Sequence, residues 1–277
     1  MNSQDKIREI AKELLSQGEV ELIIGYTESS LDNKATPIFI TDANETGKLI
    51  FDETCNLMLA KYLLRYKGKK IGIVAKPCDT RAITGYIIEN QVKRDDLKII
   101  GVSCMGMEGN KACDECTVRN PVLCDYKAGE DVDVTKLDIG ESPVKEIEKM
   151  PADERWNHIT KEFSKCIKCY ACRQSCYMCY CNTCFVDRNQ PIWADKGTSL
   201  DDIMSYHLIR AMHTAGRCIN CGICESTCPM GIDVRMLTSK IRNDSKELFN
   251  YDAGLDINEK PVVTDFKPDD KQEKFIE

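Results

Sequence analysis

The chain has 277 residues, of which 17 are cysteine, and a net charge of −7 from 38 basic and 45 acidic side chains. Its hydrophobic content of 42% is enough for a folded core, which excludes a wholly disordered chain. The acidic balance excludes a general nucleic-acid binder, and no apolar run approaches the roughly 20 residues of a membrane span. The first residues form a charged amphipathic pattern and not a signal peptide. We therefore expect a cytoplasmic protein, in which thiols stay reduced and many cysteines indicate bound metal.

Residues 1–150 predict an α/β domain with a largely parallel sheet. Apolar residues from Ile7 to Leu15 recur at helical spacing, so the domain is expected to begin with a helix. The apolar runs Val20–Ile24 and Pro37–Ile40 predict strands. Asp52 is expected to cap the N-terminus of a second helix, which carries Cys55 as a small core residue.

The next segment predicts a parallel crossover unit. Ile71–Ala75 and Leu97–Val102 are short apolar runs typical of buried strands, and Asp79 can cap a helix between them. Cys78 follows the first strand and Cys104 follows the second. Because open α/β sheets bind ligands at the carboxyl ends of their strands, we expect both thiols at one such edge.

A C-x2-C pair completes this candidate site. Gly106 and Gly109 can form a turn that returns the chain to the sheet edge after the second strand. The residues alone leave three interpretations open: an iron–sulfur cluster, a zinc site with the same ligands, or buried core thiols in place of the first two ligands. The candidate ligands are Cys78, Cys104, Cys113 and Cys116.

Residues 151–250 predict a helical domain. The polar stretch 127–150 lacks cysteine and is expected to connect the domains, with a boundary near residue 150, and residues 251–277 predict a charged C-terminal tail. Gly216 is expected to end the second of three amphipathic helices. The apolar faces of these helices are expected to comprise Trp156, Ile159 and Phe163, then Ile203, Met204, Leu208, Ala211 and Met212, and finally residues of Val234–Phe249.

Two dense cysteine runs share one spacing. Residues 166–176 read CIKCYACRQSC and residues 218–229 read CINCGICESTCP, which is the C-x2-C-x2-C-x3-C-P pattern of bacterial two-cluster ferredoxins. In this pattern the first three cysteines bind one cluster, and the fourth begins a helix that leads to the partner cluster. One 4Fe-4S cluster is therefore expected at Cys166, Cys169, Cys172 and Cys228, and the other at Cys218, Cys221, Cys224 and Cys176.

Zinc is the alternative metal that both cysteine runs could bind. Structural zinc sites usually use two separated C-x2-C pairs, or cysteine with histidine, whereas each run places three cysteines in one loop. Tyr177 stands where the pattern has proline, and Gly222 allows the second loop to approach its cluster closely. Arg81, Arg173 and Arg217 lie close to cysteines in the sequence and could donate hydrogen bonds to cluster sulfur, and the alternative is a solvated side chain.

Three further cysteines, Cys179, Cys181 and Cys184, lie close together in the sequence. Two of them with two other ligands could bind zinc, and all three with Cys124 or Cys55 could hold a fourth cluster. The alternative is a structural role without metal.

The sequence also resembles a known family. Residues 72–104 (GIVAKPCDTRAITGYIIENQVKRDDLKIIGVSC), with the C-x2-C pair after them, resemble the beta-subunit family of deazaflavin-reducing hydrogenases and formate dehydrogenases. The stretches CIKCYACRQSCYMCYCNTCFVDR and AGRCINCGICESTCPMGIDVR are similar to the ferredoxin domain appended to shorter members of this family. The resemblance implies a redox subunit of a larger oxidoreductase. It also implies a 4Fe-4S cluster, not zinc, at Cys78, Cys104, Cys113 and Cys116.

We therefore expect an electron-transfer subunit of an anaerobic formate dehydrogenase, hydrogenase or heterodisulfide-reductase-like complex, with about three 4Fe-4S clusters. Its partners would be a flavin- or metal-containing catalytic subunit and a second electron carrier. One alternative is a flavin-containing subunit that itself acts on a deazaflavin or nicotinamide. FAD binding is possible, although the sequence contains no glycine-rich dinucleotide-binding loop to support it. The other alternative is a zinc-binding interaction module. No motif assigns a catalytic residue to the chain.

Overall fold

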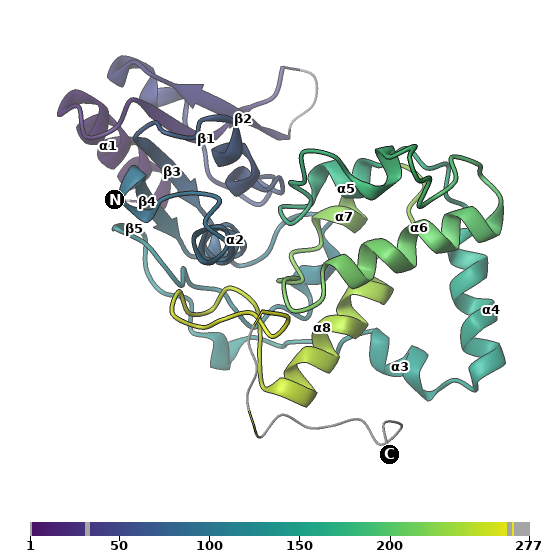
Figure 1. Ribbon diagram of the computed structural model, residues 1–277. Coiled ribbons are helices and arrows are strands. Elements are labelled where there is room, and N and C mark those ends of the chain that lie inside the picture. Colours follow the sequence, from purple (N-terminus) through teal and green to yellow (C-terminus); the bar gives the residue numbers. More distant parts are fainter. Residues whose placement is uncertain (1, 31–33, 265–267, 269–277) are drawn as a thin grey trace. The chain divides into compact units, whose positions relative to one another are not determined.

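The computed structural model describes residues 2–30, 34–264 and 268. The chain divides into two compact units, Met1–Gly140 with Gly254–Glu259, and Glu141–Ala253 with Lys260–Glu277. The first unit is α/β and the second is helical (Figure 1). No helix in the described part of the chain is both long enough and apolar enough to cross a membrane.

A five-stranded sheet with the order β2-β1-β3-β4-β5 forms the centre of the first unit. β2 pairs antiparallel with β1, and the other neighbours are parallel. All residues of β3 are buried, as expected for a parallel strand covered on both faces. The neighbouring parallel strands predicted at 71–75 and 97–102 are confirmed. The strand bounds are Leu22–Glu28 (β1), Ala35–Ile40 (β2), Ile71–Ala75 (β3), Leu97–Val102 (β4) and Tyr126–Ala128 (β5).

Two α-helices belong to the first unit: α1 (Ser3–Ser16) and α2 (Pro77–Ile88). The side chain of Asn2 accepts the backbone N–H of Asp5 and caps α1, which buries Ile7 and other apolar side chains in the core beside the sheet. α2 begins at the proline that follows β3, where the missing N–H costs nothing.

The two predicted roles of aspartate at helix N-termini are wrong. Asp52 accepts the backbone N–H of Thr54 within a turn, and the residues that follow form a short 3₁₀ helix, Leu59–Arg65. Cys55 is fully buried, as expected, but lies in that turn and not in a helix. The Asp79 carboxylate does not cap its own helix, because it accepts the backbone N–H of Ala60 and pairs with a lysine.

The second unit contains six α-helices within its described residues. The three predicted amphipathic helices are present as α4, α6 and α8. Phe163 of α4, Tyr206 of α6 and Met236 of α8 share one hydrophobic core. The bounds are Val144–Lys149 (α3), Ala152–Phe163 (α4), Ala171–Ser175 (α5), Leu200–His213 (α6), Ile223–Ser226 (α7) and Arg235–Phe249 (α8).

The predicted apolar faces of α4 and α6 are wrong in part. Trp156, Leu208 and Met212 are 52%, 42% and 64% exposed. The buried face of α6 instead includes His207 and Arg210, two polar side chains that the predicted apolar face left out.

The segments on either side of the predicted helical domain have more structure than the connector and the tail expected from the sequence. Residues 127–150 contain the end of β5, a 3₁₀ turn and α3. At Gly254 a Cβ atom would lie 2.4 Å from the backbone oxygen of Arg81, so this residue packs closely against α2. Residues 265–267 and 269–277 of the predicted tail lie outside the described residues.

Candidate functional site

The two cysteine loops of the second unit share one backbone conformation. Lys168 and Tyr170 have φ of 51° and 61°, and Asn220 and Gly222 at the equivalent positions have φ of 55° and 74°. Positive φ is uncommon for residues other than glycine, yet both loops adopt it twice. The same conformation is therefore kept despite different side chains.

Backbone amides in both loops approach cysteine sulfur. The amide of Lys168 donates to the sulfur of Cys166 over 3.3 Å. Burial raises the pKa of the Cys218 thiol, and a hydrogen bond from the Asn220 amide opposes that rise. These N–H groups favour the thiolate, which is the form that binds metal.

The helices that follow the loops bring equivalent positions together. Each loop continues into a short helix, α5 or α7, which ends just before the fourth cysteine of its run. The expectation that the fourth cysteine begins a helix is therefore wrong, because the helix precedes it. The hydroxyl groups of Ser175 and Thr227 are 3.0 Å apart. These residues immediately precede Cys176 and Cys228, so the two fourth cysteines follow a contact between equivalent residues of the two runs.

Each fourth cysteine lies near the thiols of the opposite loop. Cys176 lines a small cavity together with the second-loop thiols of Cys218, Cys221 and Cys224. The pKa of the Cys166 thiol is raised by burial and by nearby thiols, which are those of Cys172, Cys169 and Cys228. Whether these two groups of thiols bind clusters stays a prediction.

Helix α6 holds the first loop. The Nε2 atom of His207 is 3.3 Å from the sulfur of Cys166, and the hydroxyl of Tyr206 is 3.6 Å from the sulfur of Cys172. Arg210 donates to the backbone oxygen of Cys172 over 3.0 Å. Burial, with Arg210 nearby, lowers the pKa of His207 to about 3, so this ring is neutral near pH 7.

Helix α8 holds the second loop in a comparable way. Arg235 and Ser239 both donate to the side-chain oxygen of Asn220, over 3.1 and 2.9 Å. Arg235 also forms a buried ion pair with Glu225 of α7, with an Nε–Oε2 distance of 2.7 Å. The left-handed conformation of Asn220 is thus fixed from outside the loop.

Arg210 is a functional candidate that sequence reasoning missed. It is 3% exposed and lies among cysteines of both runs. Burial acts to lower the pKa of its guanidinium, but the thiols of Cys176, Cys224 and Cys172 outweigh burial and raise that pKa. Its position on a mostly apolar helix face gave no signal except the break in hydrophobic periodicity.

The first unit gathers a separate group of thiols. Cys78 lies in the first turn of α2 after β3, and Cys104 follows the neighbouring strand β4. Burial raises the pKa of the Cys78 thiol, and the thiols of Cys104 and Cys113 contribute to the rise. Burial likewise raises the pKa of Cys113, and Cys116 adds to it. The predicted third set of thiols therefore lies at the carboxyl edge of the sheet.

Lys76 is a second residue that sequence reasoning missed. It is 1% exposed, and its ammonium group pairs with Asp79 over 2.9 Å and contacts the hydroxyl of Tyr26. Its charge opposes the rise in the pKa of Cys78. The available signal was a lysine at the end of a buried strand and directly before Pro-Cys.

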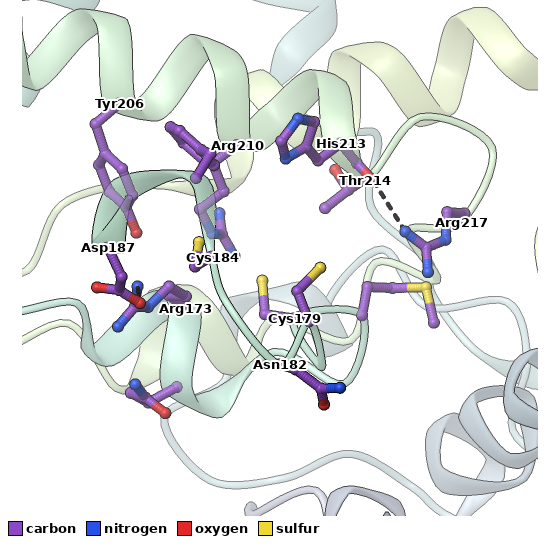
Figure 2. A pocket seen from close by; sticks show the side chains of 14 residues that line it. Arg173, Cys179, Asn182, Cys184, Asp187, Tyr206, Arg210, His213, Thr214 and Arg217 are labelled. Atoms are coloured by element: carbon purple, nitrogen blue, oxygen red, sulfur yellow. Dashed lines mark hydrogen bonds and ion pairs between the residues drawn. The ribbon is translucent and has the colours of Figure 1, made fainter. Parts of the chain in front are cut away.

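The remaining cysteines are divided between the units. Cys179, Cys181 and Cys184 line one cavity of about 480 Å³ in the second unit, beneath α6 (Figure 2), whereas Cys55 and Cys124 belong to the first unit. Among the residues that the structure describes, no group of three or more His, Cys, Asp or Glu side chains is arranged to hold a single metal ion.

Two of the three arginines expected beside cluster sulfur, Arg173 and Arg217, have identified partners. Arg173 donates to Asp187 over 2.9 Å. Burial acts to lower its pKa, and a hydrogen bond with Cys184 helps to raise that pKa above its usual value. Arg217 donates to the hydroxyl of Tyr180 over 2.8 Å and to the backbone oxygen of His213. Both side chains also line the 480 Å³ cavity.

Comparison with known proteins identifies relatives along most of the chain. No protein-family model matches it. It is 22% identical to the F420-dependent formate dehydrogenase subunit beta of Methanocaldococcus jannaschii, over 91% of this chain and 92% of that protein. It is 35% identical over 116 residues to the F420-dependent formate dehydrogenase 1 subunit beta of Methanococcus maripaludis, a match that covers 42% of this chain and 28% of that protein. These matches confirm the resemblance to the beta-subunit family of F420-reducing enzymes, and the likeness of the two cysteine-rich stretches to an appended ferredoxin domain stays a prediction. This chain is a homologue of F420-dependent formate dehydrogenase beta subunits.

Proposed function

We propose that this chain is the iron–sulfur subunit of a multi-subunit oxidoreductase of the formate dehydrogenase type, and that it relays electrons through three 4Fe-4S clusters. When bound, such clusters supply reversible one-electron transfer. The similarity to two formate dehydrogenase beta subunits supports membership of an oxidoreductase complex. The expected partners are a flavin- or metal-containing catalytic subunit and a second electron carrier, in the cytoplasm.

The proposal assigns one cluster to each gathered set of thiols, and the second unit takes the form of a two-cluster ferredoxin-like module. The observation that carries it is the position of Cys176, which lines a cavity with the thiols of the other run. This arrangement is what a crossed fourth ligand requires. The ligand sets are Cys166, Cys169, Cys172 and Cys228; Cys218, Cys221, Cys224 and Cys176; and Cys78, Cys104, Cys113 and Cys116.

The chemistry of the donors favours iron–sulfur clusters over zinc. Each set in the second unit takes three cysteines from one tight loop, whereas zinc sites usually combine two separated pairs. Backbone amides such as that of Lys168 point at cysteine sulfur, a contact that tunes cluster potentials. The buried charges of Arg210 and Lys76 lie beside the thiols and oppose the negative charge of a thiolate-bound cluster.

The experiment exchanges single cysteines and compares electron paramagnetic resonance (EPR) spectra of the reduced full chain. Because the fourth ligands cross, Cys228→Ser should change the same signal as Cys169→Ser in the first loop. Cys176→Ser should change the same signal as Cys221→Ser in the second loop. Cys55→Ser is the matched control, since Cys55 is a buried thiol in a turn of the first unit, and it should leave both signals unchanged.

The opposite pairing would contradict the proposal. If Cys228→Ser matches Cys221→Ser, each run binds its own cluster and the crossed arrangement is wrong. If no cysteine variant changes an iron signal, the iron–sulfur assignment itself is wrong.

The names of the two relatives favour one second candidate. Both are described as F420-dependent, and F420 is a deazaflavin, so this chain could itself hold a flavin and exchange electrons with a deazaflavin. Flavin absorbance in the purified subunit, bleached by one equivalent of reduced deazaflavin per flavin, is the result this candidate requires. A purified subunit without flavin would exclude it.

A further inference from the structure

The cavity beneath α6 contains the thiols that the proposed function leaves unused. Cys179, Cys181 and Cys184 all line it, from the segment between α5 and the 3₁₀ turn Phe185–Asp187. Figure 2 shows Cys179 and Cys184 on the loop side of this cavity and Arg210 on the side of α6. Three thiols from a six-residue loop thus face one space.

Positively charged side chains line the same space. Arg173, Arg210 and Arg217 all contribute to the cavity wall. Arg210 is only 3% exposed, and its Nε atom has no hydrogen-bond partner among the described residues. Buried donors are almost always satisfied, so this guanidinium indicates an anionic occupant that the cavity receives.

The size of the cavity separates two kinds of occupant. Its volume is about 480 Å³, whereas one water molecule in the liquid occupies about 30 Å³. A single zinc ion held at about 2.3 Å from each sulfur needs little more room than that. The cavity therefore fits a polynuclear group better than a single ion.

We propose that this cavity holds a fourth 4Fe-4S cluster, bound by the thiolates of Cys179, Cys181 and Cys184. The inference rests on the proposed function, because it treats the second unit as a cluster-binding module. Cysteine thiolates are the ligands that iron–sulfur clusters take in proteins. The three arginines around the cavity compensate the negative charge that thiolate ligation brings.

Two consequences follow from the ligand set. Four irons share three thiolates, so one iron has no cysteine ligand and can take a small exogenous ligand. The fourth cluster also lies near the other two proposed sites of the second unit, because Arg210 lines both this cavity and the cavity of Cys176, Cys218, Cys221 and Cys224. Arg210 also donates to the backbone oxygen of Cys172 in the first loop. The fourth cluster is thus a candidate point of electron exchange with a small molecule.

The test counts iron and acid-labile sulfide in the full chain after anaerobic purification and reconstitution. The wild-type chain should bind about 16 iron atoms, and the triple variant Cys179→Ser, Cys181→Ser and Cys184→Ser should bind about four fewer, because one cubane is lost. Cys124→Ser removes a thiol of the first unit that no proposed cluster uses and should leave the count unchanged.

A spectroscopic readout accompanies the count. Cyanide added to the reduced wild-type chain should change one EPR signal, because it binds the iron without a cysteine, and this change should be absent from the triple variant. The single variant Cys181→Ser replaces an exposed thiol. It therefore tests the same signal if the triple variant does not fold, and it should abolish the cyanide-sensitive signal.

Two experimental results would overturn the inference of a fourth cluster. A triple variant with the wild-type iron count, or a chain with one zinc bound at these thiols, would show that the cavity holds no cluster. The Cys221→Ser variant keeps this failure separate from failure of the proposed function. If Cys221→Ser lowers the iron count and the triple variant does not, only the fourth cluster is wrong. If neither variant lowers it, the proposed function fails as well.

Discussion

Each unit buries cationic side chains beside its gathered thiols, and one in each unit is almost completely buried. Arg210 in the second unit and Lys76 in the first are 3% and 1% exposed, although charged side chains are rarely buried without a partner. Lys76 has its partner in Asp79, whereas Arg210 faces sulfur atoms and a backbone carbonyl. The two residues should therefore behave differently when they are replaced.

Arg210 should tune the reduction potentials of the second unit. A cation near a cluster stabilises the reduced, more negative state, so Arg210→Gln should lower the midpoint potentials of the clusters proposed beside it. If the substitution destabilises the reduced state by about 1.4 kcal/mol, the midpoint potential of a one-electron couple falls by about 59 mV. The measurement is an EPR-monitored redox titration of the full chain.

Two control variants accompany Arg210→Gln. Arg210→Lys keeps the charge and should shift the potentials less than the glutamine variant. Arg188 is exposed, and Arg188→Gln should leave the potentials unchanged. Unchanged potentials in Arg210→Gln would mean that its charge does not act on the clusters.

Replacing Lys76 should lower the free energy of unfolding of the protein. Lys76→Met leaves the fully buried Asp79 without its cation, and breaking a buried pair in this way costs about 3–5 kcal/mol. Chemical denaturation under anaerobic conditions measures the loss. Lys98→Met is the comparison, because its ion pair with Glu19 is more than one-third exposed on both side chains and such surface pairs contribute little to stability. Equal losses in the two variants would refute the role of the buried pair.

At the scale of elements, each cysteine loop has its own supporting helix. α6 contacts the first loop through His207, Tyr206 and Arg210, and α8 contacts the second through Arg235 and Ser239. The loops have little regular structure of their own, so tertiary contacts must hold their left-handed residues. A defect in one helix should therefore affect one loop selectively.

Arg235→Ala tests this selectivity. It removes the buried pair with Glu225 and the hydrogen bond to Asn220, so we expect a loss of about 3–5 kcal/mol in unfolding free energy and a weaker EPR signal from the second-loop cluster only. Lys246 lies on the same helix, and its pair with Asp252 has a side chain 46% exposed. Lys246→Ala should change neither quantity appreciably. Equal loss of both cluster signals in Arg235→Ala would contradict selective support.

The sequence predicted those features that depend on local pattern. β3 and β4 are continuous apolar runs, and the cysteine spacing placed Cys78 and Cys104 after them, so their juxtaposition followed from strand direction alone. The roles of Asp52 and Asp79 were mispredicted, because a capping residue can bond equally well with a turn or a distant segment.

The buried polar residues could not be predicted, since their partners come from elsewhere in the fold. Arg210 interrupts the apolar face of α6, and periodicity alone cannot distinguish a buried arginine from an exposed one. The positive φ of Lys168 and Tyr170 was also hidden, because neither residue type favours it.

At the scale of the whole molecule, both units carry gathered thiols. The first unit presents its set at the carboxyl edge of a mostly parallel sheet, and the second presents its sets between short helices. A chain with several proposed clusters and no assigned catalytic residue suits electron transfer between partner subunits. The proposed function requires these thiols to bind iron and sulfide.

Metal and acid-labile sulfide analysis of the anaerobically purified full chain tests that claim most directly. At least about 12 iron atoms and a matching amount of sulfide per chain are expected, because three 4Fe-4S clusters contain about 12 irons and about 12 sulfides. A colourless chain that contains zinc and no acid-labile sulfide would contradict it.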